Sequence, residues 1–125
     1  MADTAFILIA HGAREPAWAL PLRRVSESVV AQAPELRVEL AFMELMPPDI
    51  GECAEKLVAE GFRRVLVVPL FIARGGHLTR DVPEQLEALH QKYPQVTFEL
   101  APPVGESEAV VQAMAGHVLA MARKA

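Results

Sequence analysis

The stretch "RVLVVPLFI" (residues 64–72) carries the strongest signal for a buried β-strand in the chain. It is almost continuously apolar and rich in valine, as expected of a strand that is covered on both faces of a parallel sheet. The shorter run "FILIA" (6–10) has the same character, whereas "LRVELAF" (36–42) alternates before it becomes apolar. In "VTFELA" (96–101) the alternation suits an edge strand. These segments predict four strands.

Helical patterns separate the predicted strands. The first covers residues 17–33, the second follows Asp49 as its N-cap and ends before Gly61, the third is entered through Pro83, and the last covers about residues 106–123. Apolar residues recur at helical spacing in each segment. They are Leu22, Val25 and Val29, then Ile50, Cys53, Leu57 and Val58, then Leu86 and Leu89, and finally Val110, Met114, Val118 and Met121. We expect the first three stripes to face the core, whereas core packing and a subunit interface explain the fourth equally well.

The alternation of strands and helices predicts an α/β fold. We expect a single domain over residues 1–125, with a mainly parallel, four-stranded open sheet flanked by helices in a flavodoxin-like winding with right-handed crossovers. A length of 125 residues suits one domain, and a hydrophobic fraction of 52% suits a packed core rather than a disordered chain.

Composition narrows the functional classes. The net charge of −4 disfavours general nucleic-acid binding, which needs a basic surplus. No apolar segment approaches the ~20 residues of a membrane span. Cys53 is the only cysteine, so the chain can form neither an intrachain disulfide nor a thiolate cage for zinc, and we expect a small buried hydrophobe there. Because no signal-peptide pattern is visible, we expect a cytoplasmic protein.

Chemically versatile residues follow the first three predicted strands, where open α/β sheets bind their ligands. They are His11, Gly12 and Arg14 after the first strand, Glu44, Leu45 and Met46 after the second, and Arg74, Gly75, Gly76, His77 and Arg80 after the third. Since the carboxyl ends of parallel strands meet at one edge of a sheet, we expect these residues to gather there. A glycine beside each of the two histidines lets a ligand approach the backbone closely.

The other two histidines provide a comparison. His90 lies at the end of a predicted helix and His117 lies within the last one. Single exposed histidines are common, so we expect both on the surface. His11 and His77 are instead predicted site residues, whereas Glu44 fits a site carboxylate and an ordinary solvated loop residue equally well.

Three chemistries use histidines together with a carboxylate and arginines. Histidine-based phosphoryl transfer usually requires an arginine just before the histidine, where this chain has Ala10. Nucleotide binding is disfavoured because neither a G-x-G-x-x-G motif nor a phosphate loop is present. The third is the handling of a divalent transition metal, because imidazole and carboxylate together suit iron, cobalt and nickel.

Three segments, "LIAHGAREPAW" (8–18), "AFMELMPPDI" (41–50) and "VVPLFIARGGHLTRDVP" (67–83), resemble a known family. Over nearly its whole length the chain is similar to the small class II chelatases, which insert a divalent metal ion into sirohydrochlorin. The resemblance implies that Co²⁺ or Fe²⁺, or Ni²⁺ as in archaeal relatives, is inserted in cobalamin or siroheme biosynthesis. It also implies that no organic cofactor is needed.

The same resemblance assigns residues. The family's two catalytic histidines fall on His11 and His77, as proton acceptors or metal ligands, and its strand-end glutamate falls on Glu44. A neutral imidazole can perform either task. The family more often has serine where this chain has Ala13, so a hydroxyl contact is lost there. A half-length member is expected to complete its site by forming a homodimer.

Sirohydrochlorin carries many carboxylates, which guanidinium groups bind in a planar, bidentate way. The expected substrate-binding residues are Arg14, Arg74, Arg80, Leu45, Met46 and Gly76, with Phe71 and Leu78 as further apolar walls for the macrocycle. Two alternatives stay open on the sequence. One is a histidine phosphatase-like hydrolase, and the other is a carrier that binds metal or tetrapyrrole without turnover.

Overall fold

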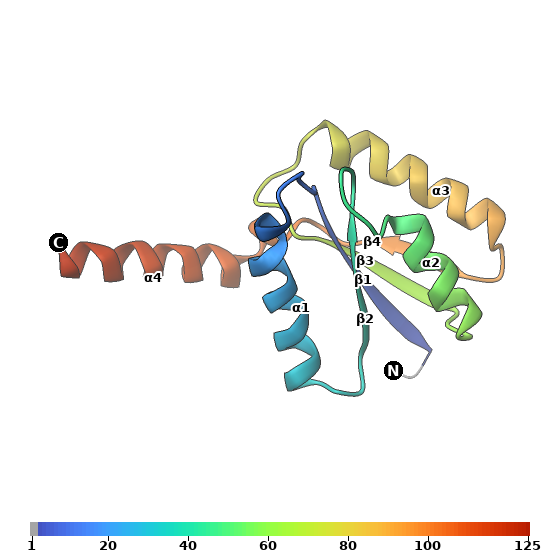
Figure 1. Ribbon diagram of the computed structural model, residues 1–125, viewed down its shortest axis with the longest axis horizontal. Helices are drawn as coiled ribbons and strands as arrows, with labels where there is room; N and C mark the ends of the chain where they lie inside the picture. The colour runs from blue at the N-terminus through green and yellow to red at the C-terminus, as the bar shows by residue number, and fades with distance from the viewer. Residues whose placement is uncertain (1–2) are drawn as a thin grey trace.

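A computed structural model of the chain describes residues 3–125, apart from the side chain of His77. Its centre is a parallel four-stranded sheet with the strand order β2-β1-β3-β4 (Figure 1). The strands are β1 (Thr4–Ala10), β2 (Arg37–Phe42), β3 (Arg64–Pro69) and β4 (Thr97–Leu100). The helices are α1 (Leu20–Gln32), α2 (Ile50–Ala59), α3 (Val82–Lys92) and α4 (Glu108–Lys124), with short helical turns at Pro16–Ala19, His77–Asp81 and Val104–Glu106. The predicted α/β class and its parallel sheet are confirmed.

Strand β3 is shorter than the predicted strand over residues 64–72. The backbone N–H of Leu70 still donates to the carbonyl of Ile9 at 2.8 Å. Beyond it, Phe71 is buried in the core and Ile72 is exposed. The end of this apolar run therefore belongs to the loop that leaves the sheet, and its composition reflects packing rather than strand pairing.

One face of the sheet packs against α2 and α3 and forms the main core. Strand residues that point to this face are fully buried, and they are Ala5, Ile7, Ile9, Val65 and Val67. Helix residues meet them from the other side, and they include Cys53, Leu57, Leu86 and Leu89. The predicted inward stripes of the second and third helices are confirmed.

Helix α2 begins and ends where the sequence predicts. The Asp49 side chain accepts a hydrogen bond from the Glu52 N–H at 2.8 Å, and the Glu52 side chain accepts one from the Asp49 N–H at 2.9 Å. This reciprocal capping box satisfies donors of the first turn. Gly61 follows the helix with φ 95°, a conformation that favours glycine. Cys53 is buried as predicted, and burial raises the pKa of its thiol to about 12.

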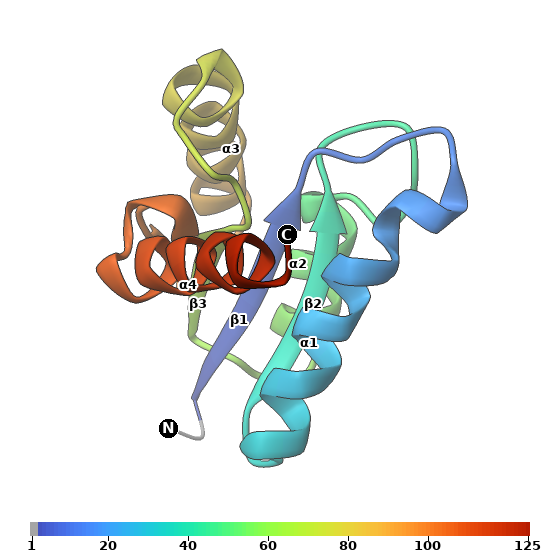
Figure 2. The same ribbon diagram turned by 90° about the vertical axis from the view of Figure 1, so that its left-hand side faces the viewer.

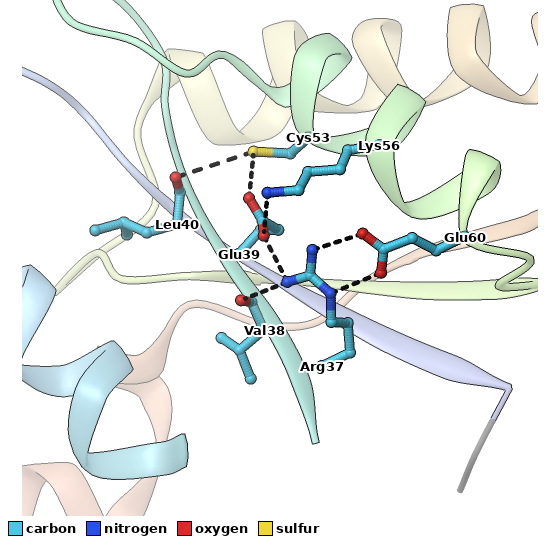
Figure 3. A network of polar contacts seen from close by, with 7 residues as sticks. All are labelled: Arg37, Val38, Glu39, Leu40, Cys53, Lys56 and Glu60. Atoms are coloured by element: carbon cyan, nitrogen blue, oxygen red, sulfur yellow. Dashed lines mark hydrogen bonds and ion pairs between the residues drawn. The ribbon is translucent and has the colours of Figure 1, made fainter. Parts of the chain in front are cut away.

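A cluster of charged residues joins α2 to the edge strand β2 (Figure 3). The Arg37 guanidinium donates to both carboxylate oxygens of Glu60, at 2.8 and 2.9 Å, and also to Glu39. The Lys56 ammonium lies 3.5 Å from the same Glu39 carboxylate. The hydrogen bonds from Arg37 lower the pKa of Glu60. Arg37, Glu39, Lys56 and Glu60, here called the Arg37 cluster, therefore tie the end of α2 to the sheet.

The opposite face of the sheet is covered only in part. Helix α1 contacts β2, and Leu22 packs there with Ala19 and Phe42 in a small second cluster. Val25 is 44% exposed, so the prediction that it faces the core is wrong. The reason is that α1 lies along the edge strand, and no residue of this helix is fully buried.

Helix α4 stands away from the sheet on the side where α1 lies (Figures 1 and 2). It is a continuous helix, as predicted, but none of its residues is buried. The explanation of its apolar stripe by packing in its own core is therefore wrong. Although α4 is rich in apolar residues, neither it nor any other helix within residues 3–125 is long and apolar enough to cross a bilayer.

Candidate functional site

His11 and Glu44 lie side by side at the carboxyl edge of the sheet, as predicted. His11 follows β1 directly and Glu44 comes two residues after β2, and both side chains are exposed. The N–H of Met43 donates to the carbonyl of Ala10 at 2.8 Å, and the N–H of Glu44 donates to the carbonyl of His11 at 3.1 Å. These bonds continue the pairing of β1 with β2 into the two loops and hold the two functional groups in neighbouring positions.

Gly12 is the residue that lets the two loops meet. Its φ of 96° lies in the left-handed region, where other residues are strained. A Cβ atom at this position would lie 1.9 Å from the carbonyl oxygen of Glu44. No larger side chain fits without separating the loops, so the contact between the loops requires glycine beside His11. The close approach of a ligand at this glycine stays a prediction.

The imidazole ring of His11 is stacked on the ring of Phe71. The two centroids are 4.1 Å apart and the planes are inclined by 19°. Phe71 is only 3% exposed, so its ring is fixed by the core and offers a rigid support for an exposed imidazole. The Phe71 carbonyl accepts a hydrogen bond from the Gly105 N–H at 3.0 Å, and a Cβ at Gly105 would lie 1.8 Å from the carbonyl oxygen of Ile72. The loop after β4 therefore braces the segment that carries Phe71.

His77 opens the short helical turn His77–Asp81, whose hydrogen bonding is of the π type. The carbonyl of Gly75 accepts hydrogen bonds from the N–H groups of Leu78 and Thr79, at 3.1 and 3.0 Å, and from the Thr79 hydroxyl at 3.1 Å. Single π turns occur frequently at functional sites. The side chain of His77 lies outside the described part of the structure, so its role stays a prediction.

The predicted substrate-binding arginines differ in their surroundings. Arg74 donates two hydrogen bonds to the carboxylate of Glu106, at 2.6 and 3.1 Å, and this contact lowers the pKa of Glu106. Arg14 and Arg80 are exposed, and at Gly76 an added Cβ would meet only the end of the Arg80 side chain, at 3.9 Å. No role was predicted for Glu106, and its position in the loop that follows β4 is the signal that could have indicated one.

The predicted apolar walls divide into exposed and buried residues. Leu45 is exposed, with φ 69°, and Met46 is half-buried against the small cluster beneath α1. Leu78 is only 2% exposed and Phe71 carries the His11 ring. The prediction that Leu78 and Phe71 form open walls is wrong, because both fill the core between the sheet and α3.

The described side chains do not by themselves form a multidentate metal site. Within residues 3–125, excluding the His77 side chain, no three histidine, cysteine, aspartate or glutamate residues lie close enough to hold one ion. His90 on α3 and His117 on α4 are exposed surface residues, as predicted. In the described part of this edge, His11 supplies an exposed imidazole and Glu44 an exposed carboxylate.

Comparison with known proteins identifies the family to which the chain belongs. The CbiX family model matches residues 5–119. The sirohydrochlorin cobaltochelatase of Sulfolobus acidocaldarius is 34% identical over 110 residues, which cover 84% of this chain and 81% of that protein. The cobaltochelatase of Methanopyrus kandleri is 35% identical over 82 residues, which cover 66% of this chain and 57% of that protein.

Two solved structures share the fold. The crystal structure of a putative cobalamin biosynthesis CbiX protein from Marinobacter aquaeolei is 30% identical, with a TM-score of 0.87, and covers 98% of this chain and 99% of that one. The sirohydrochlorin chelatase SirB from Bacillus subtilis in complex with cobalt is 28% identical, with a TM-score of 0.79, over 89% of this chain and 47% of that one. By the match of its sequence over residues 5–119 and by its fold, this chain belongs to the CbiX family.

Proposed function

We propose that this protein is a sirohydrochlorin chelatase, a lyase that inserts Co²⁺ or Fe²⁺ into the tetrapyrrole. The observation that carries the proposal is the arrangement of His11 on the buried Phe71 ring, with Glu44 held beside it. Relatives named sirohydrochlorin cobaltochelatase and sirohydrochlorin ferrochelatase support both metals as substrates. No organic cofactor enters the proposed reaction.

The reaction exchanges two protons for one metal ion. Two pyrrole N–H bonds break, the nitrogens bind the metal, and two protons leave the macrocycle. In the proposal, a neutral imidazole of His11 or His77 accepts a proton while the other imidazole offers its lone pair to the incoming metal. The Glu44 carboxylate accepts a proton or adds an oxygen ligand. Stacking on Phe71 keeps the plane of the His11 ring constant during these steps.

The substrate carboxylates would be bound by the exposed arginines of the same edge. Arg14 and Arg80 are exposed in the loops of that edge, and among the described side chains neither shows a carboxylate contact like the one between Arg74 and Glu106. In the proposal Arg74 also binds the substrate: its guanidinium leaves the carboxylate of Glu106 and binds a carboxylate of the substrate instead. Leu45 and Met46 offer apolar contact to the macrocycle, and Gly76 leaves room for it.

The carboxyl edge of the sheet in a single domain is open to solvent on the side away from the sheet. A macrocycle of this size needs a second wall to exclude water, and symmetric pairs are the commonest oligomers. We therefore propose that the working enzyme is a homodimer that acts in the cytoplasm.

The test is metal insertion by His11→Ala, with His90→Ala as the matched control. Proton transfer by a positioned side chain contributes about 10²–10⁴-fold, so we expect a loss of that order for His11→Ala and none for His90→Ala. His77→Ala should resemble His11→Ala, and the double variant should be little worse, because members of one catalytic unit are not additive. A near-normal insertion rate in His11→Ala would refute the assignment, and hydrolysis of a phosphate ester by the wild type would favour the hydrolase instead.

A further inference from the structure

The carboxylate of Glu106 occupies the guanidinium of Arg74 at the carboxyl edge of the sheet. The Nε and Nη2 atoms of Arg74 donate to the two oxygens of the Glu106 carboxylate, at 2.6 and 3.1 Å. This bidentate arrangement is also the one in which a guanidinium binds the carboxylate of a ligand. Arg74 therefore already holds a carboxylate, although it lies among the residues proposed to bind those of the substrate.

Backbone contacts, rather than this ion pair, join the two loops that carry Arg74 and Glu106. The Gly105 N–H donates to the carbonyl of Phe71 at 3.0 Å, and a Cβ at Gly105 would lie 1.8 Å from the carbonyl oxygen of Ile72. The side chains of Arg74 and Glu106 are 49% and 42% exposed, and exposed ion pairs contribute little to stability. The pair can therefore open while the loops stay together.

The loop of Arg74 also carries the support of the candidate site. Arg74 lies three residues after Phe71, whose buried ring is stacked against the imidazole of His11. The loop of Glu106 contacts the same segment through the Gly105 N–H. A ligand that approaches His11 from the open side of this edge thus meets the two loops that the ion pair connects.

From this arrangement we propose that Glu106 is an internal substitute for a carboxylate of the substrate. In the empty site the Glu106 carboxylate pairs with Arg74. When the substrate binds, one of its carboxylates takes this position, and Glu106 returns to Arg74 as the metallated product leaves. The inference rests on the chelatase function proposed above. It assigns Glu106 to the control of binding and gives it no part in the exchange of protons for metal.

The surroundings of Glu106 allow its side chain to leave Arg74. Among the described residues, its carboxylate accepts no hydrogen bond other than the two from Arg74. Arg74 is also the group that lowers the pKa of Glu106. A shallow hollow borders Glu106 and gives the side chain room to turn away from Arg74. Its other lining residues are Pro102, Pro103, Val104, Ser107 and Val110.

Competition at Arg74 has a measurable consequence for affinity. A ligand carboxylate must displace Glu106 before it reaches Arg74, so the site binds substrate and product more weakly than it would with Arg74 unoccupied. Because an exposed ion pair contributes little free energy, we expect this weakening to be about two- to fivefold. The weakening applies to both ligands, so it raises KM and eases the release of product.

Glu106→Gln tests the inference, because glutamine keeps the size of the side chain and removes its charge. We expect the Kd of metal-free sirohydrochlorin, measured from its absorbance, to fall about two- to fivefold. The inhibition constant of the metallated product should fall by the same factor. Glu106→Ala provides a second variant with the same expected result.

Glu99→Gln is the matched control. Glu99 accepts two hydrogen bonds from Arg64, both at 3.0 Å, and the two side chains are 42% and 47% exposed. Arg64 is the first residue of β3, whereas Arg74 follows the end of that strand. The control therefore makes the same change in net charge at a similar ion pair at the opposite end of the sheet. Its Kd for sirohydrochlorin should equal that of the wild type.

A double-variant cycle shows whether the effect passes through Arg74. Arg74→Met alone should weaken the binding of sirohydrochlorin. In the Arg74→Met background, Glu106→Gln should have no effect, because the competed guanidinium is gone. Added salt screens exposed ion pairs, so it should bring the Kd values of the wild type and of Glu106→Gln closer together.

Each other result overturns the inference. Weaker binding by Glu106→Gln would mean that Glu106 holds Arg74 in position for the substrate. Unchanged binding would mean that the ion pair does not compete. Equal tightening in the Arg74→Met background, or in Glu99→Gln, would mean that the lost negative charge acts without Arg74.

Metal insertion by the same samples separates this inference from the proposed function. Wild-type protein that inserts metal, with none of the expected changes in Kd among the variants, contradicts only the role of Glu106. The expected changes in Kd without metal insertion contradict only the chelatase reaction. A wild-type protein that does not bind sirohydrochlorin contradicts both.

Discussion

The Arg37 cluster and the His11 edge are both polar, but they are held in place in different ways. In the Arg37 cluster, opposite charges from β2 and α2 hydrogen bond directly to one another. At the His11 edge, positions are fixed by loop backbones that meet at Gly12 and by the buried ring of Phe71. The first arrangement uses its polar groups for structure, whereas the second leaves the side chains of His11 and Glu44 exposed to an incoming ligand.

This contrast separates stability from activity. Changes in the Arg37 cluster should lower the free energy of unfolding and leave metal insertion intact. Changes at the His11 edge should lower metal insertion by more than they lower stability. The following variants test that separation.

Among the variants that leave the side chains of His11 and Glu44 in place, Gly12→Ala should have the largest effect on activity. The new Cβ would lie 1.9 Å from the carbonyl oxygen of Glu44, so the two loops must move apart by about 1 Å or more. Misplacement of that size can cost about 10²-fold in rate. Gly61→Ala is the matched control, because its φ of 95° is almost the same but its surroundings are open.

Gly61→Ala should therefore pay only the backbone strain of the left-handed region, about 1–2 kcal/mol of stability, with a normal insertion rate. Insertion kinetics and denaturant unfolding of both variants provide the comparison. Equal activity in the two alanine variants would show that the contact between the loops is irrelevant to the site.

Phe71→Leu should reduce insertion by about 2- to 10-fold, because an aromatic pair contributes about 0.5–1.5 kcal/mol to the orientation of its partner. Leucine keeps most of the apolar volume, so much of the core is preserved. Phe62→Leu serves as the control, since Phe62 packs on the same core after α2, at the other end of the sheet. Phe71→Leu should lose more stability than Phe62→Leu, because Phe71 is fully buried and Phe62 only partly, and only Phe71→Leu should slow insertion. A similar slowing in both would assign the effect to the core rather than to the stack.

Arg37→Met should lower the free energy of unfolding by about 1–2 kcal/mol, because it removes charge-assisted hydrogen bonds to Glu39 and Glu60. Arg64→Met is the control, since the Arg64–Glu99 pair is bidentate but more exposed and should contribute less. Urea unfolding at low and high salt measures both. Insertion should be unchanged in Arg37→Met, and a large loss of activity there would end the proposed division of roles.

The protonation state of the Cys53 thiol should make the stability of the protein depend on pH. Burial raises the pKa of its thiol to about 12, from 9.0 for the unperturbed group. Because the folded pKa is the higher one, the contribution is fully present below pH 9 and is lost as the pH rises toward 12. At pH 8 we expect iodoacetamide to alkylate the folded protein at least tenfold more slowly than the unfolded chain. Fast alkylation of the folded protein would mean that α2 opens readily.

The sequence predicted those parts of the structure that depend on residues close together in the chain. The apolar runs of β1 and β3, the N-cap at Asp49 and Gly61 after α2 follow from side-chain periodicity and backbone preference. The meeting of His11 with Glu44 followed from parallel strand topology, since both residues come directly after neighbouring strands.

Features that depend on contacts between residues far apart in the chain were not predicted. The apolar stripe of α4 is the same whether it faces its own sheet or another molecule, so periodicity could not reveal that it is exposed. The ion pair between Arg74 and Glu106 joins loops 32 residues apart. The burial of Leu78 depends on the π turn at His77–Asp81, which has no recognisable sequence pattern.

Multiple turnover by the wild-type protein tests the central claim most directly. Sirohydrochlorin and Co²⁺ are supplied in large excess over the protein, and the tetrapyrrole absorbance is followed beside a protein-free reaction. The account predicts that metallated product accumulates to many equivalents per chain, at a rate proportional to protein concentration, with two protons released per metal inserted. Product that stops at one equivalent per site, or a rate no faster than spontaneous metallation, would contradict it and leave a protein that binds its ligands without catalysis.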